Sequence, residues 1–187
     1  MSWLHVVILA VIQGAAELLP VSSSAHVILA ERLLGLDPAR PELTFLLVML
    51  HTGTMLAVIQ YFWPRWRAVI ADPERGLSRV AYAKRIVLAT GLTGVLGLAL
   101  KAFIEKVLIG GPKAELEQLF RSLPLMACSL VTVGVIIVAA GSRESAANAA
   151  PLSGGRAAAI GLMQGLCLPF RGFSRSGATI STGLFLG

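Results

Sequence analysis

Long apolar segments that carry no charged residue constrain the fold of this chain more than any other feature. Only 14% of its 187 residues are charged, whereas about 25% is usual in a soluble domain. A helix needs about 20 mainly apolar residues to cross a bilayer. Residues 43–63 and 123–141 meet this requirement directly, and 86–108 meets it if the helix continues past Lys101. The sequence therefore predicts an all-α polytopic membrane protein with about three full spans and excludes a water-soluble globule.

Two further apolar runs are too short to span a bilayer and stop at breaks rich in Pro, Gly and Ser. The first run, 4–19, ends at Pro20, and the second, 157–168, ends at Pro169 and Gly172. Irregular backbone at membrane depth persists only where it is buried in protein or lines a wet cavity. Each run with its break therefore predicts a re-entrant hairpin built from two half-helices.

The two breaks are similar in sequence. Gln13 lies nine residues before the Ser-Ser-Ser-Ala of 22–25, and Gln164 lies ten residues before the Ser-Arg-Ser-Gly of 174–177. Three spans separate the copies, and an odd number of crossings inverts the second copy relative to the first. Inverted repeats with broken helices place their binding site where the breaks meet. Chance similarity between two short Ser/Gly-rich stretches is the alternative.

We therefore expect one transmembrane domain over 1–187 that contains an inverted repeat. Repeat 1 is expected at about 1–63, and repeat 2 is expected to start at about 123 and to run past 187. The two cysteines both lie in apolar runs and are expected to be small buried hydrophobic residues.

Basic residues collect between the apolar runs and predict an orientation. Sixteen Lys and Arg face ten Asp and Glu, a formal net charge of +6. Segment 64–85 has an excess of arginine and should be cytoplasmic, whereas 106–121 is balanced and should lie outside, and 142–156 returns inside. This distribution is typical of a membrane protein. A nucleic-acid binder would carry a basic stripe on a soluble surface, so no nucleic-acid partner is expected.

The first break carries a carboxylate. Gln13 and Glu17 are four residues apart and share one helix face. A carboxylate in an apolar helix costs about 2.5–3.5 kcal/mol at mid-bilayer. A cation, a metal ion or a wet cavity must offset this cost, unless Glu17 lies near the interface and is merely solvated.

Serines and a histidine follow Pro20. If a helix restarts there, one serine is its N-cap, and the free N–H groups suit an anion. His26 shares a face with Ser22 and Ser23, so it could deprotonate a hydroxyl, attack a substrate or protonate a leaving group. The alternative is a capping serine and a histidine bonded to a backbone carbonyl.

The second break carries an arginine among hydroxyl groups. Arg175, beside Ser174, Ser176 and Thr179, combines a guanidinium, hydroxyl donors and a restarting helix, which is typical of a phosphate-binding nest. We interpret Arg171 as a juxtamembrane loop residue. Two other features are not assigned to chemistry. The His-Thr-Gly-Thr of 51–54 is interpreted as helix packing, and the aromatic residues of 61–66 are interpreted as a membrane-edge anchor.

Together these motifs resemble those of the undecaprenyl-diphosphate phosphatase family of bacterial inner membranes, the non-PAP2 kind. The first family pattern, Glu or Gln, three residues, Glu, then Leu-Pro-x-Ser-Ser-x-Gly-His, is matched by Gln13, Glu17 and 19–26. The second, Pro-Gly-x-Ser-Arg-Ser-Gly-x-Thr, is matched by Pro169 and 172–179. The resemblance covers the whole chain.

The resemblance implies hydrolysis of undecaprenyl (C55 polyprenyl) diphosphate to the monophosphate, which recycles the lipid carrier of peptidoglycan synthesis. It makes Glu17, Ser23 and His26 catalytic candidates, with Ser23, His26 or water as the nucleophile. It also implies a Mg²⁺ or Ca²⁺ ion, which Glu17 would hold, in a multi-pass inner-membrane protein open to the periplasm. The partners implied are the lipid substrate and bilayer lipid, with a homodimer as one option. The predicted substrate-binding residues are Gln13, Ser22, Ser174, Arg175, Ser176 and Thr179.

The chain departs from the family pattern in three places. Ala25 replaces the usual Gly, and Phe170 and Arg171 are inserted between Pro169 and Gly172. The chain also stops within an apolar run, where family members continue into further membrane segments. We therefore expect a C-terminally incomplete piece that need not be active.

Two other functions fit part of the pattern. A lipid-phosphate transporter or flippase would also use inverted repeats and an anion site. The PAP2 phosphatases would require a Lys-rich first motif and a second catalytic His after the Ser-Arg motif, and neither is visible in the sequence.

Overall fold

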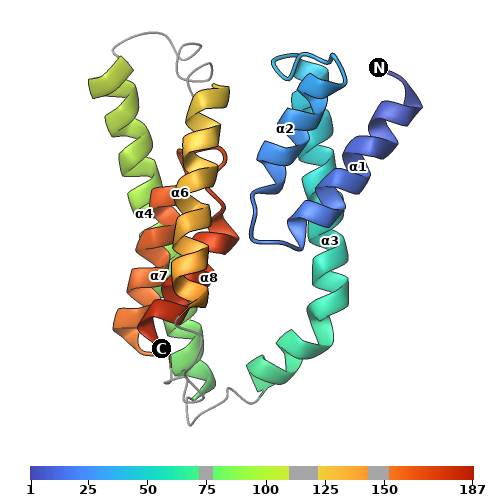
Figure 1. Ribbon diagram of the computed structural model, residues 1–187. Helices are drawn as coiled ribbons and strands as arrows, with labels where there is room; N and C mark the ends of the chain where they lie inside the picture. Colours follow the sequence, from blue (N-terminus) through green and yellow to red (C-terminus); the bar gives the residue numbers. More distant parts are fainter. Residues whose placement is uncertain (72–77, 110–121, 143–151) are drawn as a thin grey trace.

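The computed structural model describes residues 1–71, 78–109, 122–142 and 152–187, and this part of the chain is helical apart from its turns, with no strand (Figure 1). The predicted all-α class is confirmed. The elements are α1 (Trp3–Glu17), α2 (Ser23–Leu33), α3 (Pro41–Ala71), α4 (Arg79–Phe103), a π-helical turn η1 (Ile104–Ile109), α6 (Leu123–Gly141), α7 (Gly154–Cys167) and α8 (Arg175–Leu186).

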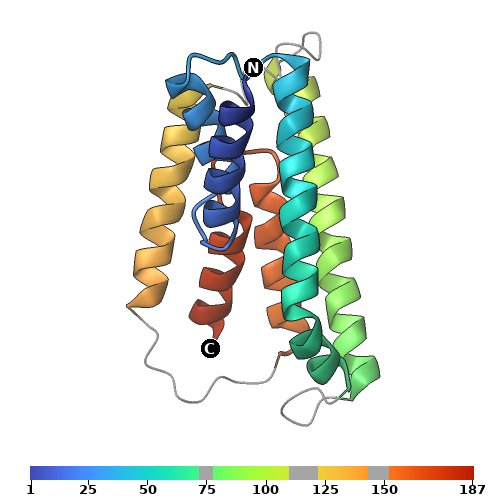
Figure 2. The same cartoon turned by 90° about the vertical axis from the view of Figure 1, so that its right-hand side faces the viewer.

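Three helices of the described residues are long and apolar enough to cross a membrane: α3, α4 with the start of η1, and α6. They extend along most of the long dimension of the molecule (Figure 2). Their large apolar side chains point mostly outward; Val95 on α4, for example, is 70% exposed. A helix that is apolar on all sides is expected where lipid, not water, surrounds it. The predicted multi-pass membrane protein with about three spans is therefore confirmed.

The predicted ends of two spans were wrong. Helix α3 does not stop before Pro64 but continues to Ala71, and it changes direction towards its C-terminal end (Figure 1). Proline inside a helix removes one hydrogen bond and bends the helix, and it need not end it. Helix α4 starts at Arg79, earlier than expected, because the Ser78 hydroxyl accepts a hydrogen bond from the Ala81 N–H and caps it. Most of the predicted 64–85 loop is therefore helical.

Other predictions about the connections are tested only in part. Lys101 lies within a continuous helix, as expected, and pairs with Glu105 at 3.9 Å. The charged residues expected to orient the chain in 72–77, 110–121 and 143–151 lie outside the described residues.

The short helices form two hairpins that enter from opposite ends of the molecule. Hairpin 1 is α1 with α2, and hairpin 2 is α7 with α8; their tips lie near mid-height (Figures 1 and 2). At the tips, the Gly177 backbone approaches the Pro20 carbonyl so closely that an added Cβ would lie 2.7 Å from that oxygen. The two predicted re-entrant hairpins are confirmed. The repeat boundaries at 1–63 and 123 stay predictions.

Hairpin 2 is held by small residues. A Cβ at Gly161 of α7 would overlap the Ala89 carbonyl oxygen of α4, so the two backbones are in direct contact. The Thr93 hydroxyl lies between them, 2.8 Å from the Ala89 oxygen and 2.9 Å from the Gly161 oxygen. Close approach through glycine and threonine is the usual way for membrane helices to pack, since lipid offers no hydrophobic drive for association. Arg85 of α4 also donates to the Leu152 carbonyl before α7.

Hairpin 1 packs through larger apolar side chains. Leu9 of α1 and Val27 of α2 are fully buried and form a core with the N-terminal half of α3. On its other side, α2 buries Ala25 and Ile28 against Met126 of α6. Helix α6 therefore connects the two halves of the molecule.

Of the two cysteines, only Cys167 is buried; Cys128 is exposed on α6. The prediction that both are buried is wrong for Cys128, because an apolar run in a membrane helix can face lipid as well as protein.

Candidate active site

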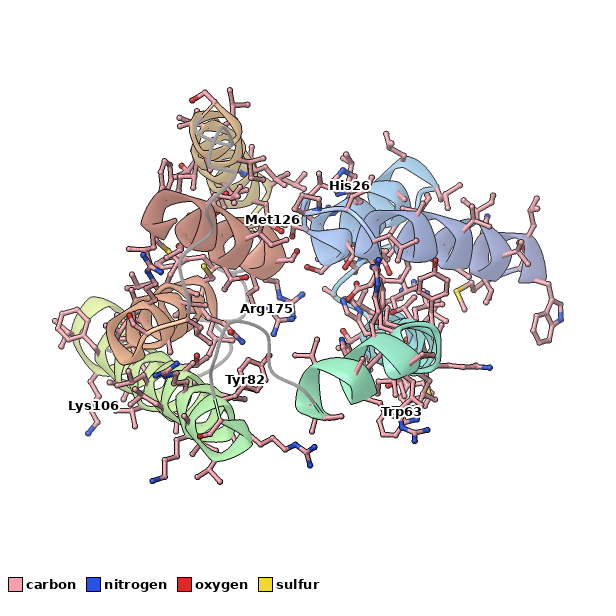
Figure 3. The ribbon with its side chains drawn as sticks, turned by 90° about the horizontal axis from the view of Figure 1, so that it is seen from below. His26, Trp63, Tyr82, Lys106, Met126 and Arg175 are labelled. Carbon is pink, nitrogen blue, oxygen red and sulfur yellow. The ribbon has the colours of Figure 1, made fainter. Side chains whose placement is uncertain are left out.

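A polar cavity of about 540 Å³ lies where the two hairpin tips meet. Its wall combines Glu17, Ser22 and Ser23 of hairpin 1 with residues 170–176 and Thr179 of hairpin 2, and includes His51 of α3. Figure 3 shows Arg175 pointing into the space between the two groups of helices. The breaks therefore meet at one site, as the repeat predicted.

A short hydrogen bond joins Glu17 and Ser23 in this cavity. The Ser23 hydroxyl donates to Glu17 Oε2 at 2.6 Å, and Gln13 Nε2 donates to the same oxygen at 2.8 Å. The first contact arises because the tip returns the chain beside the end of α1, and the second because Gln13 lies one helical turn earlier. Two donors on one oxygen hold the carboxylate in place. Glu17 is exposed to the cavity, which is the wet environment that its charge requires.

Gln13 does not reach the cavity, although a substrate contact was expected of it. Its side chain is fully buried behind Glu17, and its Nε2 also lies 3.5 Å from the Thr54 hydroxyl. The geometry makes Gln13 a residue that orients Glu17.

Helix α2 restarts at Ser23, as expected, but the predicted side-chain cap is not made. Ser22, the N-cap residue, adopts φ 64° and ψ 83°, a left-handed conformation, and its hydroxyl caps no backbone N–H. A non-glycine residue in this region costs about 1–3 kcal/mol, and such strain is concentrated at functional sites. The Ser22 hydroxyl and the start of α2 face the cavity without a capping bond.

Helix α8 starts with a regular cap. The buried Ser174 hydroxyl accepts from the Gly177 N–H at 3.1 Å and lies 3.2 Å from the Ser176 hydroxyl. The Thr179 hydroxyl donates to the Arg175 carbonyl at 2.8 Å. Because a phosphate oxygen needs donors, Thr179, whose hydrogen is already donated, is less suited to bind it than expected, whereas Ser174 accepts from Gly177 and keeps its own hydroxyl hydrogen. Arg175, exposed in the cavity, is the stronger donor.

Arg171 also lines the cavity. It lies in the turn between α7 and α8, so it is a loop residue as interpreted, and this loop forms part of the cavity wall. Gly172 has φ +92°, and a Cβ there would lie 2.8 Å from the Met126 carbonyl oxygen. Only glycine fits this conformation and this close approach.

The structure exchanges the roles that the sequence suggested for two histidines. His26 is not part of the cavity wall; its Nδ1 lies 2.9 Å from the Ser22 carbonyl oxygen, which was the alternative for this residue. His51, assigned to packing, lines the cavity, with its Nδ1 2.8 Å from the Leu47 carbonyl oxygen. A carbonyl only accepts, so Nδ1 carries the hydrogen and Nε2 remains for proton transfer.

A sequence signal for His51 existed. Within 43–63 it is the only residue among His, Lys, Arg, Asp and Glu. An ionisable group inside a membrane span is a functional candidate by default. His51 was assigned to helix packing because small residues follow it in the sequence.

Comparison with known proteins assigns the chain to a protein family. The model of the family described as bacitracin resistance protein BacA matches residues 6–187. The chain belongs to this family. The resemblance found in the two motifs is thereby confirmed.

Relatives within the BacA family carry informative names. Undecaprenyl-diphosphatase 2 of Acinetobacter baylyi is 55% identical over 188 residues, which cover 100% of this chain and 65% of that protein. The undecaprenyl-diphosphatases of Desulfosudis oleivorans and Salinibacter ruber are 36% and 33% identical, over 97% and 99% of this chain and 66% and 67% of their own lengths. The chain thus spans about two thirds of these curated relatives, and both hairpins lie within the matched part.

Proposed function

We propose that this site hydrolyses the diphosphate of undecaprenyl diphosphate, releasing the lipid monophosphate and phosphate and so recycling the lipid carrier of peptidoglycan synthesis. The observation that carries the proposal is the cavity where Arg175, at the start of α8, shares one wall with the hydrogen-bonded Glu17 and Ser23. The names of the relatives support the same substrate.

Binding depends on charge and on oriented donors. The Arg175 guanidinium presents a planar fork that matches two phosphate oxygens. The starts of α2 and α8 both face the cavity, and free N–H groups at helix N-termini favour anions. Arg171 adds a second cation at the hairpin tip. Phosphoryl transfer is catalysed mainly by such positioning and charge stabilisation.

The geometry favours Ser23 as the nucleophile, with water and His26 as the alternatives. Glu17 Oε2 takes the Ser23 proton as Ser23 Oγ bonds to the terminal phosphorus and the bond to the bridging oxygen breaks. The lipid monophosphate leaves, and His51 Nε2 is placed to move a proton at the departing or entering oxygen. Water then hydrolyses the phosphoserine and restores the hydroxyl.

A divalent cation fits the residues present only together with the substrate. Glu17 is the only carboxylate among the described residues that line the cavity, and these residues hold no cluster of three His, Cys, Asp or Glu. Mg²⁺ is commonly held by one or two carboxylates and substrate phosphates, so Glu17 and the diphosphate oxygens would hold it. When bound, the ion would neutralise charge that develops on the phosphate oxygens.

The test is phosphate release from farnesyl diphosphate by the purified protein in lipid nanodiscs. The proposal predicts farnesyl monophosphate and phosphate in equal amounts, at a rate that rises with protein concentration. A lipid-phosphate transporter with the same anion site would bind the diphosphate and release no phosphate. Binding without phosphate release would contradict the hydrolase proposal and support the transporter.

The proposal includes an inner-membrane location with the cavity open to the periplasm. The arginine excess of 64–85 supports a cytoplasmic position for the end of the molecule where α3 ends and α4 begins. A cytoplasm-active reporter fused at Gly76 should therefore be active, and a periplasm-active reporter fused at Lys113 should be active too. The opposite pair of activities would invert the orientation and place the site entrance on the other side.

The contact between the tips offers a matched pair of substitutions. Gly177→Ala would place a methyl group 2.7 Å from the Pro20 carbonyl oxygen, and overpacking of this kind costs about 1–3 kcal/mol. Residues of both tips form the cavity wall, so Gly177→Ala should also lower phosphate release by at least about tenfold. A tenfold loss is about 1.4 kcal/mol of transition-state stabilisation. Ala25→Gly, at the matching position of hairpin 1, removes a methyl that packs on Ile28 and Met126. It should cost about 1 kcal/mol of stability and leave turnover intact.

Thermal unfolding and phosphate release should be measured on both variants of this pair. Equal turnover in the two would show that the approach of the tips does not shape the site.

A further inference from the structure

The tip of hairpin 1 contains a serine in a conformation that favours glycine. Among the described residues, Ser22 is the only one other than glycine with a positive φ, at 64°. Ser22 directly precedes Ser23, so its left-handed backbone determines where the Ser23 hydroxyl lies relative to Glu17. A side chain in this region of φ and ψ costs free energy, and the conformation persists only where surrounding contacts hold it.

Three donors converge on the carbonyl oxygen of Ser22. The backbone nitrogens of Ala25 and His26 lie 3.2 Å and 3.4 Å from this oxygen, and His26 Nδ1 lies 2.9 Å from it. The two backbone bonds are the ordinary first bonds of a helix. The shortest of the three contacts comes from the imidazole, which reaches back one helical turn to the strained residue.

Hairpin 2 shows the same start of a helix without a histidine. Its N-cap residue, Ser174, has an ordinary extended backbone with φ −64° and ψ 112°. The positive φ of that tip belongs to Gly172, which adopts it without steric cost. Ala178, four residues after Ser174, donates its N–H to the Ser174 carbonyl at 2.9 Å, and its side chain has no donor. A side-chain donor therefore accompanies the left-handed cap residue and not the regular one.

We propose that His26 is a positioning residue, which holds Ser22 in its left-handed conformation and thereby places Ser23 against Glu17. This inference rests on the proposed function, in which Ser23 is the nucleophile. His26 is not part of the cavity wall, and the carbonyl that its Nδ1 faces can only accept a hydrogen. The ring thus acts through the backbone of Ser22 and not on the substrate.

The first experiment compares two substitutions of His26 in phosphate release from farnesyl diphosphate. An asparagine amide nitrogen can take the place of Nδ1 and donate to the Ser22 carbonyl, but it cannot attack phosphorus or transfer a proton. His26→Asn should therefore keep kcat within about threefold of the wild type. His26→Leu has no donor and should lower kcat by at least about tenfold, with a smaller change in KM.

His51→Asn is the matched control for His26→Asn. His51 Nδ1 also lies near the carbonyl four residues earlier, that of Leu47, but His51 lines the cavity. Asparagine keeps this bond and loses the ring Nε2, so kcat should fall by about 10²-fold or more. If His26→Asn were as slow as His51→Asn, the imidazole of His26 would be needed for the chemistry itself, and the positioning role would be wrong.

The second experiment asks whether glycine at position 22 makes the histidine dispensable. Glycine adopts a positive φ without strain, so adding His26→Leu to Ser22→Gly should lower kcat by less than about threefold. Both proteins of this comparison carry Ser22→Gly, so any contact of the Ser22 hydroxyl with the substrate cancels. A chemical role for His26 predicts the same loss, at least about tenfold, with serine or glycine at position 22. Equal losses would overturn the inference.

Thermal unfolding of the same four proteins separates this inference from the proposed function, because it needs no substrate. His26→Leu should lower the unfolding temperature by about 2–4 °C when residue 22 is serine and by less when it is glycine. If this difference is found while the wild type releases no phosphate, the positioning of Ser22 by His26 is supported and hydrolysis is contradicted. If the wild type hydrolyses normally and the two substitutions are additive in both measurements, the positioning role is overturned and the proposed function stands.

Discussion

Replacing Arg175 by lysine should lower phosphate release from farnesyl diphosphate by about 10²–10³-fold, the usual cost of removing one group that stabilises transition-state charge. The lysine keeps the positive charge and loses the planar fork that binds two oxygens at once. Arg175 is the first residue of α8 and faces the cavity, so its guanidinium acts together with the N–H groups of that helix. The loss should appear mainly in kcat, because the charge that the fork stabilises develops in the transition state.

Arg171→Lys is the matched control for this prediction. Arg171 lines the same cavity but belongs to the turn before α8, and a lysine there can keep the charge that draws the anion in. Its turnover should fall by less than about tenfold, with the larger change in KM. Both variants should be measured at saturating substrate after size-exclusion chromatography confirms their folding. If Arg171→Lys were the damaging change and Arg175→Lys harmless, the inserted segment would be the diphosphate binder.

Charge-free runs and their breaks predicted most of the fold, because the bilayer leaves few alternatives. A backbone in hydrocarbon must satisfy its own hydrogen bonds, so an uncharged run of the required length is a helix, and a Pro/Ser break must be shielded by protein. The ends of the spans were harder to predict. Past the hydrocarbon edge the constraint disappears, and local capping by Ser78 or a tolerated Pro64 decides where a helix ends.

The site was predictable where the motif itself carries the chemistry. Arg175 and the Glu17–Ser23 pair lie within a few residues of a helix break, so their meeting follows from the hairpins. The two histidines were not predictable in this way. Whether His26 or His51 reaches the cavity depends on which way each helix face turns in the packed molecule, and that is set by partners distant in sequence. His26 Nδ1 instead lies within hydrogen-bonding distance of the Ser22 carbonyl oxygen, four residues earlier in the chain.

The roles of buried polar groups also required the structure. Gln13 has the right spacing to share a site with Glu17, yet full burial leaves it able only to orient that carboxylate. Ser174 and Thr179 both match the family pattern, but Thr179 already donates its hydroxyl hydrogen to the Arg175 carbonyl, whereas Ser174 accepts from Gly177 and can still donate. Sequence shows that a donor is present; only the fold shows whether its hydrogen bond is already made.

Glu17→Gln tests the other half of the site and should be as damaging as Arg175→Lys. Glutamine keeps the size of the side chain and an oxygen that can accept from Gln13 and Ser23, so the tip should fold as before. It removes the negative charge and the ability to take the Ser23 proton. Turnover should therefore fall by about 10²–10³-fold, and the dependence of the rate on Mg²⁺ should weaken, since a neutral amide is a poorer ligand for a hard cation.

The measurement is phosphate release across a Mg²⁺ titration, with thermal unfolding as the check on folding. Glu42→Gln is the matched control: it removes a carboxylate from the exposed first turn of α3, outside the described cavity wall, and should leave rate and metal response unchanged. The two consequences of Glu17→Gln are separable. A slow variant with the Mg²⁺ response of the wild type would make Glu17 the base for Ser23 and place the cation elsewhere. Near-native turnover with an unchanged titration would mean that Glu17 only anchors the hairpin tip, and both the proton transfer and the metal assignment would then be wrong.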